Sequence, residues 1–247
     1  MQALILAAGM ATRLRPLTDK CPKCLLEVKG KTLLRRTLDA ILGAGIKDIT
    51  IVTGYKAEMI KEFAEMYIKE NTTADKTENG SISISFIHNA DYSTTNNIYS
   101  LWLAKDKMEG KDFLLMDSDI YCDPMLVKTI VDQKVSALAL NRHECGEEEI
   151  KVIVDGEGNI TEISKVCSRE DAIGESVGVE RMTAEYSVAL YRELDIMCGR
   201  EGLTDVFYER AFERLIPQGH TFRVVDTTDF FSMELDTVED FETASKM

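Results

Sequence analysis

Short apolar runs and amphipathic stretches alternate along the first half of the chain. Residues 3–7 (ALILA) and 113–116 (FLLM) are continuous apolar runs, the pattern of strands buried on both faces of a parallel sheet. Residues 49–52 and 82–86 have the composition of two further strands, the second with clear alternation. Each strand is followed by a loop or by a stretch long enough for a helix.

Apolar residues between these strands recur at helical spacing. One helix is predicted from Thr32, whose side chain can cap its N-terminus, to Gly43 and Gly45, which can end it. Two more are predicted within residues 59–67 and 98–107. Such alternation implies right-handed βαβ units in a doubly wound sheet, whose ligands bind beyond the carboxyl ends of the strands.

The pattern changes in the second half of the chain. Residues 136–140 form another apolar run, and residues 150–154 and 160–165 flank the turn-forming sequence 155–159 (DGEGN). This arrangement predicts an antiparallel hairpin. We expect this half of the chain to cover the cleft and to select the second substrate. The polar residues 70–81 lack periodicity and are predicted to form a surface loop.

Composition and charge narrow the class of protein. The 247 residues are 45% hydrophobic and 29% charged, as in ordinary globular proteins. A net charge of -14 argues against a nucleic-acid partner. No apolar run approaches the roughly 20 residues that span a bilayer, and residues 1–8 lack the basic flank of a signal peptide. We therefore expect a cytoplasmic protein that does not bind membranes.

Cysteines and histidines give no clear site. Six cysteines contain one close pair, Cys21–Cys24, and we interpret them as reduced, mostly buried side chains, with a redox or zinc site as the less favoured alternative. The scattered His88, His143 and His220 predict no metal site or catalytic cluster. The acidic residues 147–149 are expected to form a solvated turn.

A polar loop follows the first apolar run and has the composition of a phosphate-binding loop. Gly9 allows the backbone to approach a phosphate closely, and Arg13 and Lys23 supply fixed positive charges, with Pro22 stiffening the approach to Lys23. An ordinary connection with solvated basic residues is the alternative. The whole string favours phosphate binding.

This string resembles the nucleoside-triphosphate transferase family, which includes sugar-1-phosphate nucleotidyltransferases and phosphocholine cytidylyltransferases. The family signature is similar to L-A-A-G-x-G-T-R-L-x-P-x-T followed by P-K. The chain matches it at Leu6–Gly9, Thr12–Leu14, Pro16, Thr18 and Pro22–Lys23. It departs at Ala11, where the family usually has a second glycine, and this departure bears on triphosphate binding.

The resemblance implies an α/β fold with a doubly wound, mostly parallel, Rossmann-like sheet and a small antiparallel subregion. It implies transfer of a nucleotidyl group from a nucleoside triphosphate to a small phosphorylated acceptor. We expect a single domain over residues 1–247, with the nucleotide bound by residues 1–135 and the acceptor by residues 136–247. The expected nucleotide-binding residues are Leu6, Ala8, Gly9, Met10, Ala11, Thr12, Arg13, Lys23, Asn96, Asn97, Ser100 and Asp117.

Two carboxylates are candidates for a magnesium site. Asp119 follows a buried strand, so that its side chain emerges at the cleft rim where a hard cation could join it to phosphate oxygens. Asp119 and Asp236 resemble the two metal ligands of the family, which implies Mg²⁺ as cofactor. The alternative is that Asp119 caps a turn and Asp236 caps a helix. The expected catalytic residues are Lys23, Arg13 and Asp119.

The polar segment 89–97 leads into a predicted helix and is the candidate for recognising the base. Its amides and hydroxyls can bind a base edge, although Asn97 can equally be only an N-cap. From Asn96 onward, the string N-N-x-Y-S-L resembles the phosphocholine cytidylyltransferase branch of the family, which uses CTP. It differs from the G-T-A-x-A-type segment of sugar nucleotidyltransferases. The resemblance therefore favours CTP.

The same branch implies an acceptor such as phosphocholine or 2-aminoethylphosphonate. A quaternary ammonium would require an aromatic cage, whereas carboxylates suffice for a primary amine, so the sequence leaves the head group open. Lys165 resembles the lysine that relatives direct at the acceptor phosphate, and a solvated surface lysine is the equal alternative. The expected acceptor-binding residues are Tyr92, Lys165, Glu175, Glu180 and Tyr186, whereas Trp102 is expected in the core.

Two other functions fit the same motifs. The first is a sugar-1-phosphate nucleotidyltransferase with a hexose pocket and a preference for UTP or dTTP. The second is a non-catalytic regulatory homologue that keeps the fold. The sequence argues against a non-catalytic homologue, because it contains both cations, Arg13 and Lys23, and both carboxylates, Asp119 and Asp236. The oligomeric state is not predicted.

Overall fold

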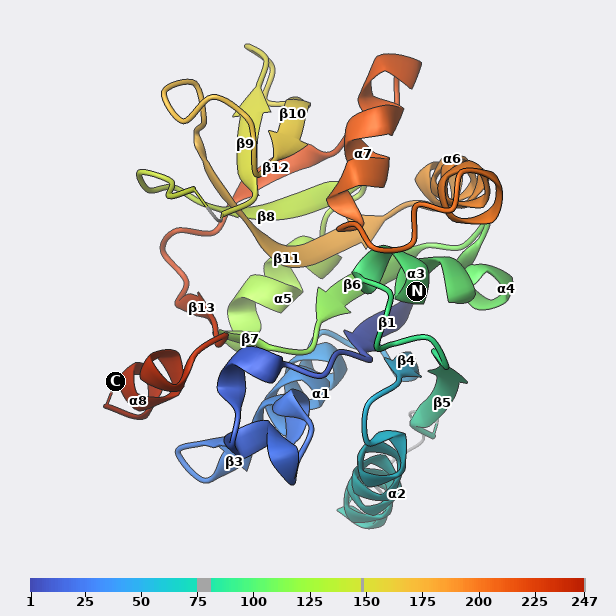
Figure 1. Ribbon diagram of the computed structural model, residues 1–247, viewed down its shortest axis with the longest axis vertical. Coiled ribbons are helices and arrows are strands. Elements are labelled where there is room, and N and C mark those ends of the chain that lie inside the picture. The colour runs from blue at the N-terminus through green and yellow to red at the C-terminus, as the bar shows by residue number, and fades with distance from the viewer. Residues whose placement is uncertain (75–80, 148, 247) are drawn as a thin grey trace.

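A nine-stranded mixed sheet crosses the centre of the molecule, with helices on both faces (Figure 1). The computed structural model describes residues 1–74, 81–147 and 149–246. One part of the sheet consists of parallel strands in the order β5-β4-β1-β6. These are β1 (Gln2–Ala7), β4 (Asp48–Thr53), β5 (Ser83–His88) and β6 (Phe113–Asp117).

The antiparallel part of the sheet begins at β11 (Gly174–Met182), which pairs with β6. Beyond it lie β8 (Ala137–Asn141) and the hairpin of β9 (Lys151–Val154) and β10 (Ile160–Ser164), while β12 (Arg223–Asp226) runs parallel to β8. The predicted α/β sheet, parallel in its first half with an antiparallel subregion, is confirmed. Because the sheet contains strands from both halves, the two halves share one framework.

Strand alternation builds a core on each face of the sheet. Leu4 and Leu6 of β1 belong to one core, while Ala3, Ile5 and Ala7 belong to the other, since successive side chains of a strand point to opposite faces. The first core lies under α3 (Asn97–Leu103), α4 (Lys105–Met108), α6 (Ala184–Leu194) and α7 (Glu209–Leu215). The second lies under α1 (Leu33–Gly43), α2 (Ala57–Ala74) and α5 (Pro124–Val131).

Several short elements complete the chain. Two-stranded pairs are made by β2 (Glu27–Val28) with β3 (Lys31–Thr32), and by β7 (Ile120–Cys122) with β13 (Ser232–Glu234). Single helical turns span Thr12–Leu14, Leu17–Asp19, Lys23–Leu25 and Ile216–Gln218, a π-helix spans Asp195–Arg200, and α8 spans Val238–Lys246.

Local signals set the helix boundaries. Thr32 caps α1, because its hydroxyl accepts a hydrogen bond from the backbone N–H of Arg35 at 3.1 Å. Gly45 follows the helix at φ +88°, as predicted. The predicted loop over residues 70–81 is wrong in its first part, since α2 continues to Ala74; residues 75–80 lie outside the described residues. None of the described helices is long and apolar enough to cross a membrane.

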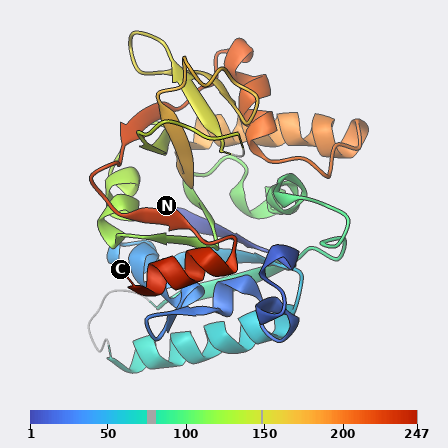
Figure 2. The same ribbon diagram turned by 60° about the vertical axis from the view of Figure 1, so that its left-hand side comes forward.

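The last part of the chain returns to the beginning. The strand β13 pairs with β7, and α8 packs beside β2, so that the C-terminal helix lies against the N-terminal part of the chain (Figure 2). Leu235 and Phe241 bury their side chains against Leu14, Val28 and Leu33 in a third, smaller core. This packing brings the residues after β13 alongside the loop that follows β1.

Gly174 is required where β11 passes β8. Its φ is +152°, and a Cβ atom there would lie 2.1 Å from the carbonyl oxygen of Asn141. We expect Gly174→Ala to lower the free energy of unfolding by about 3 kcal/mol, because backbone would have to move. Urea denaturation would measure this change. Gly156→Ala is the matched control, since a Cβ atom there meets nothing within 4 Å; equal stability of the two variants would contradict the argument.

Candidate active site

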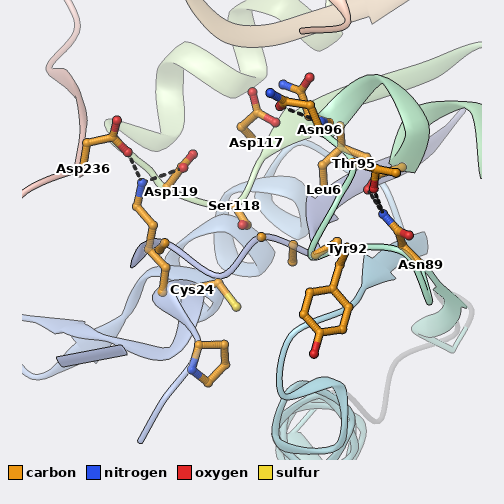
Figure 3. Close-up of a pocket in the computed structure, with 18 of the residues that line it drawn as sticks. Leu6, Cys24, Asn89, Tyr92, Thr95, Asn96, Asp117, Ser118, Asp119 and Asp236 are labelled. Atoms are coloured by element: carbon orange, nitrogen blue, oxygen red, sulfur yellow. Dashed lines mark hydrogen bonds and ion pairs between the residues drawn. The ribbon is translucent and has the colours of Figure 1, made fainter. Parts of the chain in front are cut away.

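A cavity of about 370 Å³ lies at the carboxyl ends of β1 and β6. It is lined by the loops after these two strands, by the segment that leads into α3, and by residues around β13. Figure 3 shows Asp119 and Asp236 at one end, Asn89 and Thr95 at the other, and Asp117 between them. The loops after Ala7 and Met116 therefore face one cleft, as the strand pattern predicts.

The loop after β1 turns sharply at Ala11, before the helical turn that starts at Thr12. Ala11 is left-handed, with φ +46° and ψ +55°, and its carbonyl accepts hydrogen bonds from Leu14 N and from the Thr18 hydroxyl. The left-handed backbone conformation strains residues that have a Cβ atom, so glycine suits this position better than alanine. Ala8, Gly9, Ala11 and Arg13 line the cavity, as Leu6 does, whereas Met10 and Thr12 do not.

Lys23 is the central cation of the cavity. Its side chain is 10% exposed, and its Nζ donates hydrogen bonds to Asp119 Oδ2 at 2.7 Å and to Asp236 Oδ1. Arg13 also pairs with Asp236. Burial raises the pKa of Asp236, but the charges of Lys23 and Arg13 more than offset this and hold it below its usual value. Burial lowers the pKa of Lys23, and the two carboxylates raise it overall.

The structure rules out the helix-capping alternative for Asp236. Asp240 Oδ2 accepts hydrogen bonds from the backbone N–H groups of Asp236 and Thr237, and the Thr237 hydroxyl accepts one from Asp240 N. This reciprocal arrangement is a capping box for α8. The carboxylate of Asp236 takes no part in this cap and lines the cavity, where it pairs with Lys23 and Arg13.

Three carboxylates at this end could hold a hard cation. The side-chain oxygens of Asp119, Glu234 and Asp236 lie within 4.8 Å of one another. Asp119 Oδ1 is buried and has no hydrogen-bond partner among the described residues, so it has a free lone pair at this site. Oxygen ligands of this kind fit Mg²⁺ or Ca²⁺. The ammonium of Lys23 stands between two of the three carboxylates.

Asn89 organises the other end of the cavity. Its Nδ2 donates to the hydroxyls of Thr95 and Ser100 at 3.1 and 3.2 Å, and its Oδ1 accepts from Asp91 N at 2.9 Å. Asn96 is the N-cap of α3, while Asn97 Oδ1 accepts a hydrogen bond from Tyr208 N. The alternative that Asn97 is the N-cap is therefore wrong.

A cluster of buried acids lies beneath the cavity. The Tyr208 hydroxyl donates to Asp117 Oδ2 at 3.0 Å, and the fully buried Glu180 and the buried Glu209 each have an Oε2 atom with no partner among the described residues. Burial raises the pKa of Asp117 and Glu180 well above their usual values and that of Glu209 to about 7. The electrostatic potential of this floor is negative once any of these acids ionises.

Three of the five predicted acceptor residues lie at the cavity or next to it. Tyr92 lines the cavity, and the Nζ of Lys165 lies 4.5 Å from the ring centre of Phe207, which also lines it. Glu175 lines a smaller recess that shares Glu234 with the cavity, and burial raises its pKa to about 7.

Two predicted acceptor residues need correction. Glu180 is fully buried in β11, and Tyr186 is 4% exposed and packs on Phe222 with ring centres 4.4 Å apart, so neither reaches the cavity. Trp102 is half-buried against the core, as expected, and its Nε1 donates to Asp195.

Several cavity residues were not predicted as site residues. Glu234 lies two positions before Asp236 on a strand-like segment, and this spacing could have indicated it, because alternate residues of a strand share a face. No comparable feature of the sequence indicates that Phe207 lines the cavity. The cavity also contains Ala7, Pro22, Cys24 and Ser118, together with Asn89 and Thr95 from the segment 89–97 that is predicted to recognise the base.

The sequence of this chain is similar to those of known proteins. Residues 2–143 match the family described as nucleotidyl transferase. The chain is 26% identical to the CTP:phosphoglutamine cytidylyltransferase of Campylobacter jejuni, over 98% of each chain. It is 30% identical to the choline-phosphate cytidylyltransferase of Streptococcus pneumoniae, over 63% of this chain and 60% of that protein.

A solved structure of the CTP:phosphocholine cytidylyltransferase of Streptococcus pneumoniae superposes with a TM-score of 0.79 at 24% identity. The superposition covers 99% of this chain and 97% of that one, and shows that the two share a fold.

Lys23→Met should destabilise the protein, because it leaves Asp119 and Asp236 close together without the ammonium. We expect the free energy of unfolding at pH 7 to fall by about 3 kcal/mol. The ion pairs of Asp236 stabilise the fold fully when the pH is above the pKa of this carboxyl in the unfolded chain, about 3.9. This stabilisation is lost as the pH falls through the lower pKa that Asp236 has in the folded protein. The difference from wild type should therefore shrink below about pH 4.

Urea denaturation between pH 3 and pH 7 would measure the Lys23→Met effect. Lys20→Met, at an exposed position three residues earlier, is the control. A loss of stability as large in Lys20→Met, or one that is independent of pH, would show that Lys23 does not act through these carboxylates.

Proposed function

Because the chain belongs to the nucleotidyl transferase family, we propose that it transfers a cytidylyl group from CTP to a small phosphorylated amino alcohol or phosphonate. Pyrophosphate is the second product. The observation that carries this proposal is that one cavity brings together the loop after β1, the Lys23 bridge between Asp119 and Asp236, and the buried acids beneath it. These are the parts that phosphoryl-type transfer needs, namely fixed cations, carboxylates for a metal and a place for the acceptor.

The amide-rich end of the cavity supports a pyrimidine nucleotide. Asn89, Thr95 and Asn96 line it, and their amides and hydroxyls offer both donors and acceptors to a base edge. Two relatives, from Campylobacter jejuni and Streptococcus pneumoniae, are named as cytidylyltransferases. Together with the N-N-x-Y-S-L string, these observations favour CTP over UTP or dTTP.

Magnesium is the cofactor that the proposal includes. Asp119 and Asp236 would hold it, with Glu234 close enough to take part. Bound there, the ion would supply positive charge that offsets the charge developing on the phosphates. Lys23 would then exchange its carboxylate partners for a phosphate oxygen, since its flexible stem lets the ammonium move a short distance.

The reaction needs no nucleophile or general base from the protein. A phosphate oxygen of the acceptor, already anionic at neutral pH, attacks the α-phosphorus of CTP in line. A new P–O bond forms as the bond to the β-phosphate oxygen breaks, and pyrophosphate carries away the electron pair. Arg13 and Lys23 stabilise the phosphates, and the backbone around Gly9 positions them.

The charges at the cavity favour an acceptor with an ammonium group. Asp117 and Glu234 line the cavity, and burial raises the pKa of both, that of Glu234 to about 7, so an ammonium group beside them would favour their charged forms. Arg13 and Lys23, the cations that line the cavity among the described residues, are both paired with Asp236. Among the described residues, the aromatic side chains that line the cavity are Tyr92 and Phe207, which come from separate segments. Carboxylates without an aromatic cage suit a primary ammonium better than a quaternary one.

A grid of substrates would test the function. We expect pyrophosphate release with CTP and either phosphoethanolamine or 2-aminoethylphosphonate, at a kcat/KM at least tenfold above that with phosphocholine. UTP, dTTP, ATP and GTP should give little release. Release only with glucose-1-phosphate and a nucleotide other than CTP would instead identify a sugar nucleotidyltransferase, and no release with any pair would argue for a non-catalytic homologue.

Asp119→Asn should lower kcat/KM at least 100-fold, because the amide removes a charged ligand at the proposed metal site. The fold should persist, as the side chain is only partly buried. Steady-state rates over a magnesium series would measure the effect, with the exposed Asp132→Asn as control. Near-normal rates at saturating Mg²⁺ would remove Asp119 from the site.

A further inference from the structure

Four side chains of the kinds that bind metals converge where the loop between β8 and β9 lies beside β11. His143, Cys145 and Glu149 come from the loop, and Glu175 comes from the start of β11. The sequence pattern predicts scattered histidines and a solvated acidic turn at residues 147–149. The structure instead places Glu149, half-buried, against His143; residue 148 lies outside the described residues.

The distances between the side-chain atoms match a metal site. His143 Nε2 lies 3.4 Å from Glu149 Oε2 and 3.6 Å from Glu175 Oε2. These separations exceed a normal hydrogen bond. Both are close to the edge of a zinc-centred tetrahedron, which is about 3.4 Å for ligand bonds of about 2.1 Å. Ligand atoms of His143, Cys145 and Glu149 all lie within 4.8 Å of one another.

We propose that His143, Cys145, Glu149 and Glu175 bind one divalent cation of the zinc class. A thiolate and an imidazole favour zinc or cobalt over magnesium, and four protein ligands make a closed, structural site. On binding, the Cys145 thiol loses its proton to solvent and the imidazole binds as the neutral base through Nε2. This site differs in its ligands from the all-oxygen group of Asp119, Glu234 and Asp236.

The nearby cations are engaged elsewhere and shape the loop. The buried Lys151 Nζ donates to the carbonyls of Gly146, Glu147 and Glu149, at 3.1 to 3.3 Å. Arg169 Nε donates to the carbonyl of Cys145 at 2.9 Å. These bonds hold the backbone of the loop in place, so that its side chains converge before any metal binds.

The site adjoins the proposed acceptor region. Glu175 lines the small recess that also contains Glu234, which in turn lines the main cavity. A bound cation would therefore fasten the loop to β11 and neutralise one carboxylate behind the acceptor region. Its role is to position Glu175, and it takes no part in bond making.

Cobalt titration tests the site without relying on catalysis. Metal-free protein, with Mg²⁺ in excess to occupy oxygen sites, would be titrated with Co²⁺ and followed by its thiolate-to-cobalt charge-transfer absorption. We expect one cobalt per chain and complete displacement by Zn²⁺. Cys145→Ser should abolish the absorption, whereas Cys122→Ser, at a half-buried cysteine of β7, should keep it.

The ligand set is tested with two milder variants. His143→Asn and Glu149→Gln change partly exposed side chains and should weaken cobalt binding at least tenfold, with metal-free circular dichroism and Tm unchanged. Absence of the absorption in the wild type would overturn the proposal. Persistence of the absorption in Cys145→Ser would also overturn it, because another cysteine would then supply the thiolate. Unchanged cobalt affinity in both milder variants would do the same.

Discussion

The ion bridge of Lys23 to Asp119 and Asp236 is the contact on which the cavity depends. It joins three distant parts of the chain, namely the loop after β1, the end of β6 and the segment after β13. Each carboxylate would repel the other without the ammonium between them. Hydrophobic packing of α8 on Leu14 and Leu33 brings Asp236 into range, so apolar burial positions a charged group whose interactions are specific and directional.

The parts of the fold that could be predicted are those governed by local rules. The apolar runs at residues 3–7 and 113–116 became the buried strands β1 and β6, and the hydroxyl of Thr32 caps α1 as expected. The cavity positions of Gly9, Lys23 and Asp119 follow from the same logic, since the loops after neighbouring parallel strands meet at one edge of the sheet. Short motifs next to strongly patterned strands are therefore informative.

The rest depends on tertiary packing that no local pattern encodes. Glu180 was expected at the acceptor, but β11 lies between β6 and β8 and buries this side chain completely. Phe207 enters the cavity only because the chain before α7 crosses above α3, where Asn97 binds Tyr208 N. His143 and its three proposed partners are separated in sequence, and the fold of the loop beside β11 brings their side chains together.

The late position of Asp236 in the chain has a consequence for biosynthesis. Translation proceeds from the N-terminus, and chains can begin to fold while they are being made. The strands β1, β4, β5 and β6 can pair before β13 and α8 have been synthesised, but Lys23 lacks one of its two carboxylate partners until then. A nascent chain that ends before β13 can therefore pair its four parallel strands while Lys23 still lacks the carboxylate of Asp236.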